Sequence, residues 1–236
     1  MNQPLKVLLL LTAIGAGVTF AMSPGVQPTG DPARTGTLAP LTPVDTGSVL
    51  GPLRCPPGGY LCADVERAGT IRVRRWTAPV TTLVVHVPVP DFEAPAEAAR
   101  LQSAAAAGVR AWNGHPFPVR IETRSDEGAH FSVRWVRTLG GDAVGVARTR
   151  WSLAGGLQVT AVDLATRNPF APDVAIDPAQ VRLTAAHEMG HALGLPHSDF
   201  DRDVMYPRNT ASSLTARDYR SMESLYGLPD GAELAP

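Results

Sequence analysis

The chain has 236 residues, a formal net charge of −1 and 44% hydrophobic residues. This composition is sufficient for one ordinary domain with a packed core. The near-neutral charge argues against a nucleic-acid-binding protein, which would normally show a basic surface or a high isoelectric point.

The first 21 residues have the pattern of an export signal. Lys6 precedes an apolar run from Val7 to Phe20, and small residues at Thr19 and Ala21 suit a signal peptidase. The run is too short and too rich in glycine for a stable membrane span after cleavage. We therefore expect a secreted protein, extracellular or periplasmic, with an uncleaved anchor as the alternative.

Residues 22–69 read as a leader or linker, with the start of ordered structure near Tyr60. Proline, glycine, threonine and alanine dominate its first part, and such a segment buries too little apolar surface to offset the entropy of ordering. We expect the main folded domain over residues 70–229 and a short tail over 230–236. Whether residues 22–69 are removed from the mature protein, as a pro-segment would be, stays open at this point.

The first half of the domain alternates strands with one helix. β-Branched content predicts strands over 71–76 and 81–87. Residues 94–112 then show apolar positions at spacings of three and four, which predicts a helix that Asn113 and Gly114 end. Further strands are expected over 119–123, 130–136, 144–151 and 157–164.

The second half contains two marked helices. Asp177 is a good N-cap, Pro178 suits the first helical position, and Gln180 could complete a capping box. This helix should end near Gly194, which can adopt a left-handed conformation. The last helix should begin at Thr215, paired with Asp218, and end at Gly227. Strands cluster without a helix between most of them, so the predicted class is α+β with helices packed on a mixed sheet.

A metal-binding pattern ends the first of these helices. His187 and His191 are four residues apart and share one helix face, and a turn at Gly194 could bring His197 round as a third ligand. Three neutral nitrogen ligands with one open position are typical of catalytic zinc. Glu188 follows the first ligand and could act as general base on a water activated by the metal. Zinc would also stabilise the oxyanion formed at a peptide carbonyl.

These residues resemble the metzincin zinc proteases. Their signature is an extended three-histidine motif followed by a methionine turn, and Val204-Met205-Tyr206-Pro207 looks like that turn. The resemblance implies that Met205 forms an apolar floor beneath the three ligands. Pro207 stands where the astacin-like group has an additional tyrosine ligand, so none is expected.

Within the metzincins, the chain is most similar to the matrixins over residues 76–228. Ser198 after the third histidine, the Met-Tyr-Pro turn, the last helix and Trp76 before a strand carry this similarity. It implies a zincin-type catalytic domain with a twisted five-stranded mixed sheet, three helices and a substrate cleft. The implied activity is hydrolysis of peptide bonds in a polypeptide substrate, and we expect a monomer.

Further metal ions, beyond the one that the three histidines could bind, are less well indicated by the sequence. A second, structural zinc is expected to be absent, because no histidine lies between His130 and His187. Calcium binding is possible but unsupported. Oxygen ligands could come from four aspartates, which fit capping or loop roles better: Asp142, Asp163, Asp173 and Asp177.

The two cysteines allow alternative interpretations. In an exported protein, Cys55 and Cys62 indicate a local disulfide first. Matrixin pro-segments, however, inhibit with a thiolate in a Pro-Arg-Cys-Gly context, and Arg54-Cys55 matches part of that motif. Inhibition through a Cys55 thiolate therefore remains an alternative to the disulfide. A third alternative is that the two cysteines have neither role.

Substrate binding is predicted by analogy with the matrixins. An extended peptide should pair with an edge strand, for which 145–149 is the candidate. Leu183, Tyr206, Pro207 and Arg208 should line the pocket for the residue after the scissile bond. A zinc-binding or adhesion protein that keeps the fold without turnover is the alternative function, and a peptidase confined to one partner is another.

Overall fold

The computed structural model describes residues 51–77, 82–114, 120–124 and 126–236. The expected signal peptide over 1–21 and the first part of the leader lie outside the described residues. The described chain is α+β, as predicted, and its main sheet has five strands in the order β4-β3-β5-β7-β6.

The main sheet is mixed. Strands β3 (Thr82–His86), β4 (Arg120–Arg124), β5 (Phe131–Val136) and β7 (Gly156–Ala165) pair in parallel. Strand β6 (Gly145–Ser152) pairs antiparallel with β7 and lies at the edge. Each of the five follows its predicted range closely, so the β-branched and alternating patterns located this sheet well. The outer edge of β6 has no strand partner among the described residues.

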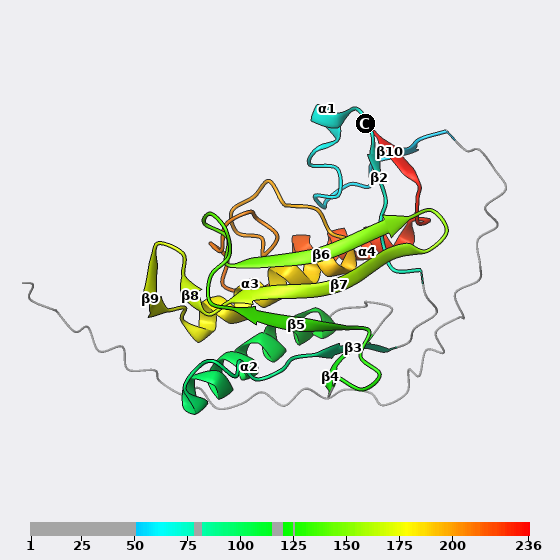
Figure 1. Cartoon of the computed structure of the whole chain (residues 1–236). Helices are drawn as coiled ribbons and strands as arrows, with labels where there is room; N and C mark the ends of the chain where they lie inside the picture. Colours follow the sequence, from blue (N-terminus) through cyan, green and yellow to red (C-terminus); the bar gives the residue numbers. More distant parts are fainter. Residues whose placement is uncertain (1–50, 78–81, 115–119, 125) are drawn as a thin grey trace, which may run out of the picture. The chain divides into compact units, whose positions relative to one another are not determined.

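Three long helices accompany the sheet, as the resemblance implied: α2 (Pro95–Arg110), α3 (Pro178–Leu193) and α4 (Ala216–Gly227). Helix α2 continues into a 3₁₀ turn, Ala111–Gly114. Figure 1 shows α2 and α3 beside the sheet. They approach closely at Gly108, where an added Cβ would lie 2.2 Å from the Arg182 carbonyl oxygen. None of the helices described has the length and apolar character that a bilayer span requires.

The core lies between the sheet and α2 and α3. The predicted apolar face of α2 is buried throughout, and Trp112 after it is fully buried. The Trp112 indole N–H donates to the Ala186 carbonyl in α3 at 2.9 Å. This bond ties the first helix to the helix that carries the histidine motif.

A second, small sheet joins the two ends of the described chain. Its strands are β1 (Leu53–Arg54), β10 (Glu233–Ala235) and β2 (Ile71–Arg72). Strand β10 runs parallel to β1 and antiparallel to β2. The packed domain therefore extends beyond the expected boundaries at 70 and 229, because strands from both flanking segments pair with each other.

The strand predicted over 71–76 is much shorter than expected. Regular pairing ends after Arg72, because the backbone then bonds to two different segments. The Val73 N–H donates to the Ala232 carbonyl at 2.8 Å, whereas the Arg75 carbonyl accepts from the Leu157 N–H at 3.0 Å. The segment thus connects the small sheet to the main one.

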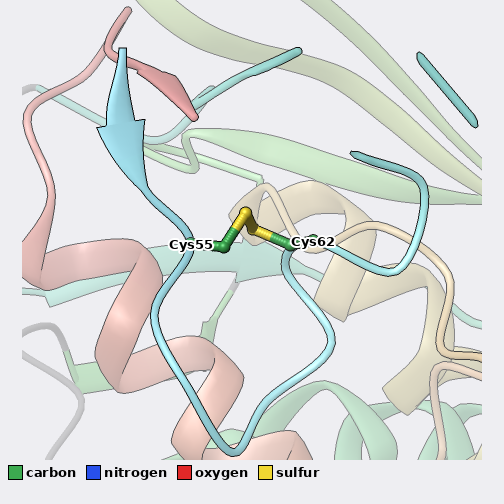
Figure 2. Close-up of a disulfide and its surroundings, with 2 residues drawn as sticks. All are labelled: Cys55 and Cys62. Atoms are coloured by element: carbon green, nitrogen blue, oxygen red, sulfur yellow. A yellow bond between two sulfur atoms is a disulfide. The ribbon is translucent and has the colours of Figure 1, made fainter. Parts of the chain in front are cut away.

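We call residues 53–74 the N-terminal strap. A disulfide joins Cys55 to Cys62 and closes a loop (Figure 2). Tyr60 in this loop is 1% exposed, and its hydroxyl donates to the Asp218 carboxylate in α4 at 2.8 Å. A four-residue helix, α1 (Val65–Ala68), follows. The remaining elements form a hairpin ahead of α3: β8 (Arg167–Asn168) and β9 (Ala171–Ala175).

Candidate metal centre

Helix α3 presents the histidine motif between two well-defined ends. At its start the Asp177 carboxylate accepts from the Ala179 N–H at 2.7 Å, in place of the predicted capping box with Gln180. At its end Gly194 has a φ of 106°, a left-handed value that favours glycine. An added Cβ there would lie 2.0 Å from the Arg74 carbonyl oxygen. The glycine therefore permits both the turn toward His197 and the close approach of the strap.

The structure brings the three histidines together. One ring nitrogen from each of His187, His191 and His197 lies within 4.8 Å of the others. The Nε2 atoms of His191 and His197 are 3.1 Å apart. Tetrahedral zinc with Zn–N bonds of about 2.0–2.1 Å would place its nitrogens about 3.3 Å apart. The distance between His191 and His197 is close to this value, and 4.8 Å is the upper bound for the other two pairs.

Backbone carbonyls orient two of the rings. The Nδ1–H of His187 donates to the Val204 carbonyl at 2.7 Å, and the Nδ1–H of His191 donates to the Leu195 carbonyl at 2.8 Å. A carbonyl only accepts, so in the neutral ring Nε2 keeps its lone pair. Both rings therefore keep an Nε2 lone pair that a metal ion could use, and His191 Nε2 lies against His197 Nε2.

The environment favours neutral imidazoles. Burial lowers the pKa of His187 below its ordinary value, and it lowers the pKa of His191 to about 3. Burial also lowers the pKa of His197, which the charge of Asp64 partly opposes. Metals bind the unprotonated ring, so these shifts keep the group competent for metal binding at neutral pH.

Glu188 lies beside this group with its carboxylate against the edge strand. It is 6% exposed, and its Oε2 accepts from the Ala147 N–H at 2.7 Å. Burial raises its pKa to about 7, and the Ala147 N–H partly opposes the rise. At Gly145 an added Cβ would lie 2.7 Å from Glu188 Oε1. A carboxyl with this pKa is suited to exchanging a proton near neutral pH.

Met205 packs under the helix turn between the first two histidines. It is fully buried, and a Cβ on Gly190 would lie 2.2 Å from its sulfur. Its carbonyl accepts from the Ser198 N–H at 2.8 Å, next to the third histidine. The methionine thus contacts both the helix and the segment that carry the ligands.

A hydrogen-bond chain links the strap to His187. Val204, whose carbonyl holds the His187 ring, donates its N–H to the Asp218 carboxylate at 3.1 Å. The other oxygen of Asp218 accepts from the Tyr60 hydroxyl. The sequence predicted Asp218 correctly as the capping partner of Thr215, and both bonds of that capping box are present. No sequence spacing signals the connection to Tyr60, because it spans distant segments.

The residues predicted to line the substrate pocket come from α3 and the loop after Met205. Leu183 is half-buried on α3, and the loop is bonded to the helix at its two sequence neighbours. The Asn209 amide donates to Thr184 Oγ1 at 2.6 Å, and the Arg182 guanidinium donates to the Ser212 carbonyl at 3.0 Å. The loop that begins with Tyr206 and Pro207 therefore follows this part of α3.

The candidate calcium ligands have varied surroundings. Asp163 is 2% exposed and forms salt bridges with Arg134 at 2.7 Å and Arg148 at 2.6 Å. Asp177 caps α3. Asp142 and Asp173 are exposed. Two of the four aspartates thus already have partners within the protein.

The cysteines are bonded to each other. Neither sulfur is a thiolate in this structure, so the arrangement is the local disulfide and not the metal-binding thiolate of a matrixin pro-segment.

Comparison with known proteins places this site in a family. Residues 98–227, more than half of the chain, match the model of the matrixin family. The chain is 44% identical over 52 residues to macrophage metalloelastase of Rattus norvegicus, which covers 20% of this chain and 11% of that protein. It is 43% identical over 60 residues to macrophage metalloelastase of Oryctolagus cuniculus, covering 23% and 13%. The chain thus matches only a small part of these relatives. The family match, however, covers strands β4 to β7 of the main sheet, most of α2, all of α3 and α4, and the three histidines, so the chain belongs to the matrixin family.

Proposed function

We propose that the chain is a zinc-dependent endopeptidase. One observation carries this proposal: imidazole nitrogens of three histidines converge on one point, and the buried Glu188 directly follows the first of these histidines on α3. Family membership supports the same activity. We propose His187, His191 and His197 as the zinc ligands and Met205 as the apolar floor beneath them.

Glu188 has the role of general base and then general acid. A zinc ion held by the three imidazoles would lower the pKa of a water molecule and polarise the scissile carbonyl. The Glu188 carboxylate accepts the proton of the attacking water and passes it to the departing amine. Burial raises the pKa of Glu188 to about 7, and the positive charge of a bound zinc ion would lower it again, so the carboxylate form that accepts the proton is favoured in the loaded site.

We propose that the polypeptide substrate adds to the outer edge of β6. Residues 145–149 are the candidate segment, since Gly145 and Ala147 lie against Glu188, and strand addition supplies main-chain hydrogen bonds that do not depend on side chains. Leu183, Tyr206 and Pro207 then line the pocket after the scissile bond. The bonds that hold their loop against α3 support this assignment.

We also propose that the protein acts outside the cytoplasm. The export-like first 21 residues support this, and so does the disulfide, because such bonds persist mainly in oxidising compartments.

Replacing Glu188 tests the function. In Glu188→Gln, hydrolysis of a peptide library should fall by about 10²–10⁴-fold, because the general base is lost. Zinc content, measured by atomic absorption, should stay at one ion per chain. Glu223→Gln makes the same change on an exposed face of α4 and should keep full activity. If zinc-loaded wild-type protein cleaves nothing, the protein is a non-catalytic zinc binder and the proposal fails.

A further inference from the structure

The third histidine differs from the other two in the part of the chain that carries it. His187 and His191 belong to helix α3, whereas His197 lies beyond the turn at Gly194, outside any helix or strand. A ligand on a loop is positioned less precisely than one on a helix unless its neighbours are held by further contacts. The contacts of the loop that follows His197, residues 198–204, therefore decide how well this ligand is placed.

A buried polar network holds this loop against α4. At its centre, Asp203 is 1% exposed, and its carboxylate accepts from the Ser198 hydroxyl at 2.5 Å. The same carboxylate accepts from Thr215 Oγ1 at 2.8 Å and from Arg217 Nη1 at 2.7 Å. Ser198 is buried too and directly follows His197. The network thus begins one residue from the third histidine and ends in α4.

Arg217 makes the most widely spread contacts of this network. Its Nη1 donates to Ser198 Oγ at 3.1 Å as well as to Asp203, and its Nη2 donates to the Asp199 carboxylate. The last bond holds the pKa of Asp199 below its ordinary value. A guanidinium carries five N–H donors in a rigid fork, so a single arginine can hold three positions of the loop at once.

We infer that Arg217 is a positioning residue of the metal centre, which fixes His197 through Ser198 and Asp203 and thereby raises the affinity for zinc. The bonds of Arg217 go to the loop and not to an imidazole, so it acts on the ligand through other residues. This inference rests on the zinc ligands of the proposed function, but not on peptide hydrolysis.

The physical argument starts from the burial of Asp203. Breaking a buried ion pair by removing one partner is strongly destabilising, because the remaining charge stays buried without its counterion. Asp203 can relieve this cost only by moving toward solvent, and its bond to Ser198 then breaks or moves with it. Either change loosens or displaces the backbone next to His197. The backbone of the other two histidines keeps its position, since α3 holds it.

Arg217→Met tests this role, because it removes the guanidinium and keeps most of the aliphatic stem. The zinc dissociation constant, measured by competition with a chromogenic chelator, should rise about tenfold or more, as is usual when a metal ligand loses its support. Arg220→Met is the matched control on the same helix. Arg220 Nε donates to the Gly58 carbonyl in the strap at 2.9 Å, so this variant loses a contact away from the loop. Its zinc dissociation constant should change less than about twofold.

A conservative variant keeps the test decisive where Arg217→Met does not fold. Arg217→Lys retains the positive charge but lacks the planar fork, so it should fold and should raise the zinc dissociation constant about threefold. A wild-type constant in folded Arg217→Met would overturn the inference. The same result in Arg217→Lys would overturn it if only that variant folds.

A double-mutant cycle identifies the ligand on which Arg217 acts. In a His197→Ala background the third ligand is already lost, so Arg217→Met should change the zinc dissociation constant less than about twofold. In a His191→Ala background the full effect of about tenfold should remain. Equal effects in both backgrounds would overturn the assignment to His197.

A measurement on zinc-free protein separates this inference from the proposed function. The Ser198 N–H donates to the Met205 carbonyl at 2.8 Å and reports on the backbone beside His197. Its NMR order parameter should fall from about 0.85, the value of a rigid backbone, to below about 0.6 in Arg217→Met, and it should stay high in Arg220→Met. If wild type binds no zinc, the proposed function fails and this measurement alone decides the role of Arg217. A rigid Ser198 amide in Arg217→Met would overturn that role.

Discussion

At the scale of single residues, the site depends on groups that hold the ligands as well as on the ligands. The ring of His187 reaches the strap through Val204, Asp218 and Tyr60. All four are buried. Loss of a hydrogen-bond donor to a buried carboxylate costs free energy of folding. Loss of the hydrogen bonds that orient a metal ligand lowers the affinity for the metal. Tyr60 is therefore a positioning residue that acts on the centre from a distance.

Tyr60→Phe tests this chain of bonds. We expect the zinc dissociation constant to rise by several-fold to about tenfold, measured by competition with a chromogenic chelator. Tyr226→Phe is the control, because the Tyr226 hydroxyl donates to the Leu193 carbonyl, which is not one of the carbonyls that hold a ligand ring. Both variants should lose similar stability, but only Tyr60→Phe should bind zinc more weakly. Unaltered zinc affinity in Tyr60→Phe would show that the chain does not position His187.

The sequence predicted the convergence of His187, His191 and His197, because helical spacing and a glycine turn are local properties. It did not predict the contacts around them. The Ala147 N–H and the carbonyls of Val204 and Leu195 are backbone groups, which every residue has. The Tyr60–Asp218 bond joins residues 158 positions apart, and single-sequence patterns carry no information at that range.

Among the helices and strands, those with a strong sequence pattern were predicted, and those with a weak pattern were not. Helix α4 has its capping box and the main strands have five or more residues of strand-forming sequence, so their positions were predicted closely. Strands β1, β2 and β10 contain two or three residues each and were missed or overextended. Such strands exist because distant segments pair, and short segments have too few residues for a periodic signal. The order of the sheet likewise follows from pairing between distant strands.

The disulfide stabilises the strap, which contributes two of these short strands. Its loop has a sequence separation of 7, for which the loss of unfolded-chain entropy corresponds to roughly 2–3 kcal/mol. The double variant Cys55→Ser/Cys62→Ser should lose about this much free energy of unfolding, measured by urea denaturation. Wild-type protein kept in reductant should match it. Equal stability of oxidised wild type and double variant would show that pairing and burial alone hold the strap.

At the scale of the whole molecule, the α+β class and the five-stranded mixed sheet were predicted and are confirmed. The prediction placed most of the strap outside the domain, because prolines and glycines dominate the segment that leads into it. In the structure, the strap instead contributes four buried side chains to the core: Tyr60, Leu61, Val65 and Val73. Local composition was a poor guide here, since burial depends on the surface that the rest of the chain offers.

This arrangement predicts where the chain can be shortened. Burial of an aliphatic side chain contributes about 1.5–3 kcal/mol, so Leu61, Val65 and Val73 together contribute roughly 4–9 kcal/mol before Tyr60 and the disulfide are counted. Domains are stable by only about 5–15 kcal/mol in total. A protein of residues 51–236 should therefore unfold cooperatively on heating, whereas one of residues 75–236, which lacks only the strap, should show no cooperative transition and should bind zinc poorly. Calorimetry and zinc content measure both properties. A cooperative transition of the shorter protein near the Tm of the longer one would contradict this prediction and would show that the strap can be removed. The core between the sheet, α2 and α3 would then supply the stability by itself.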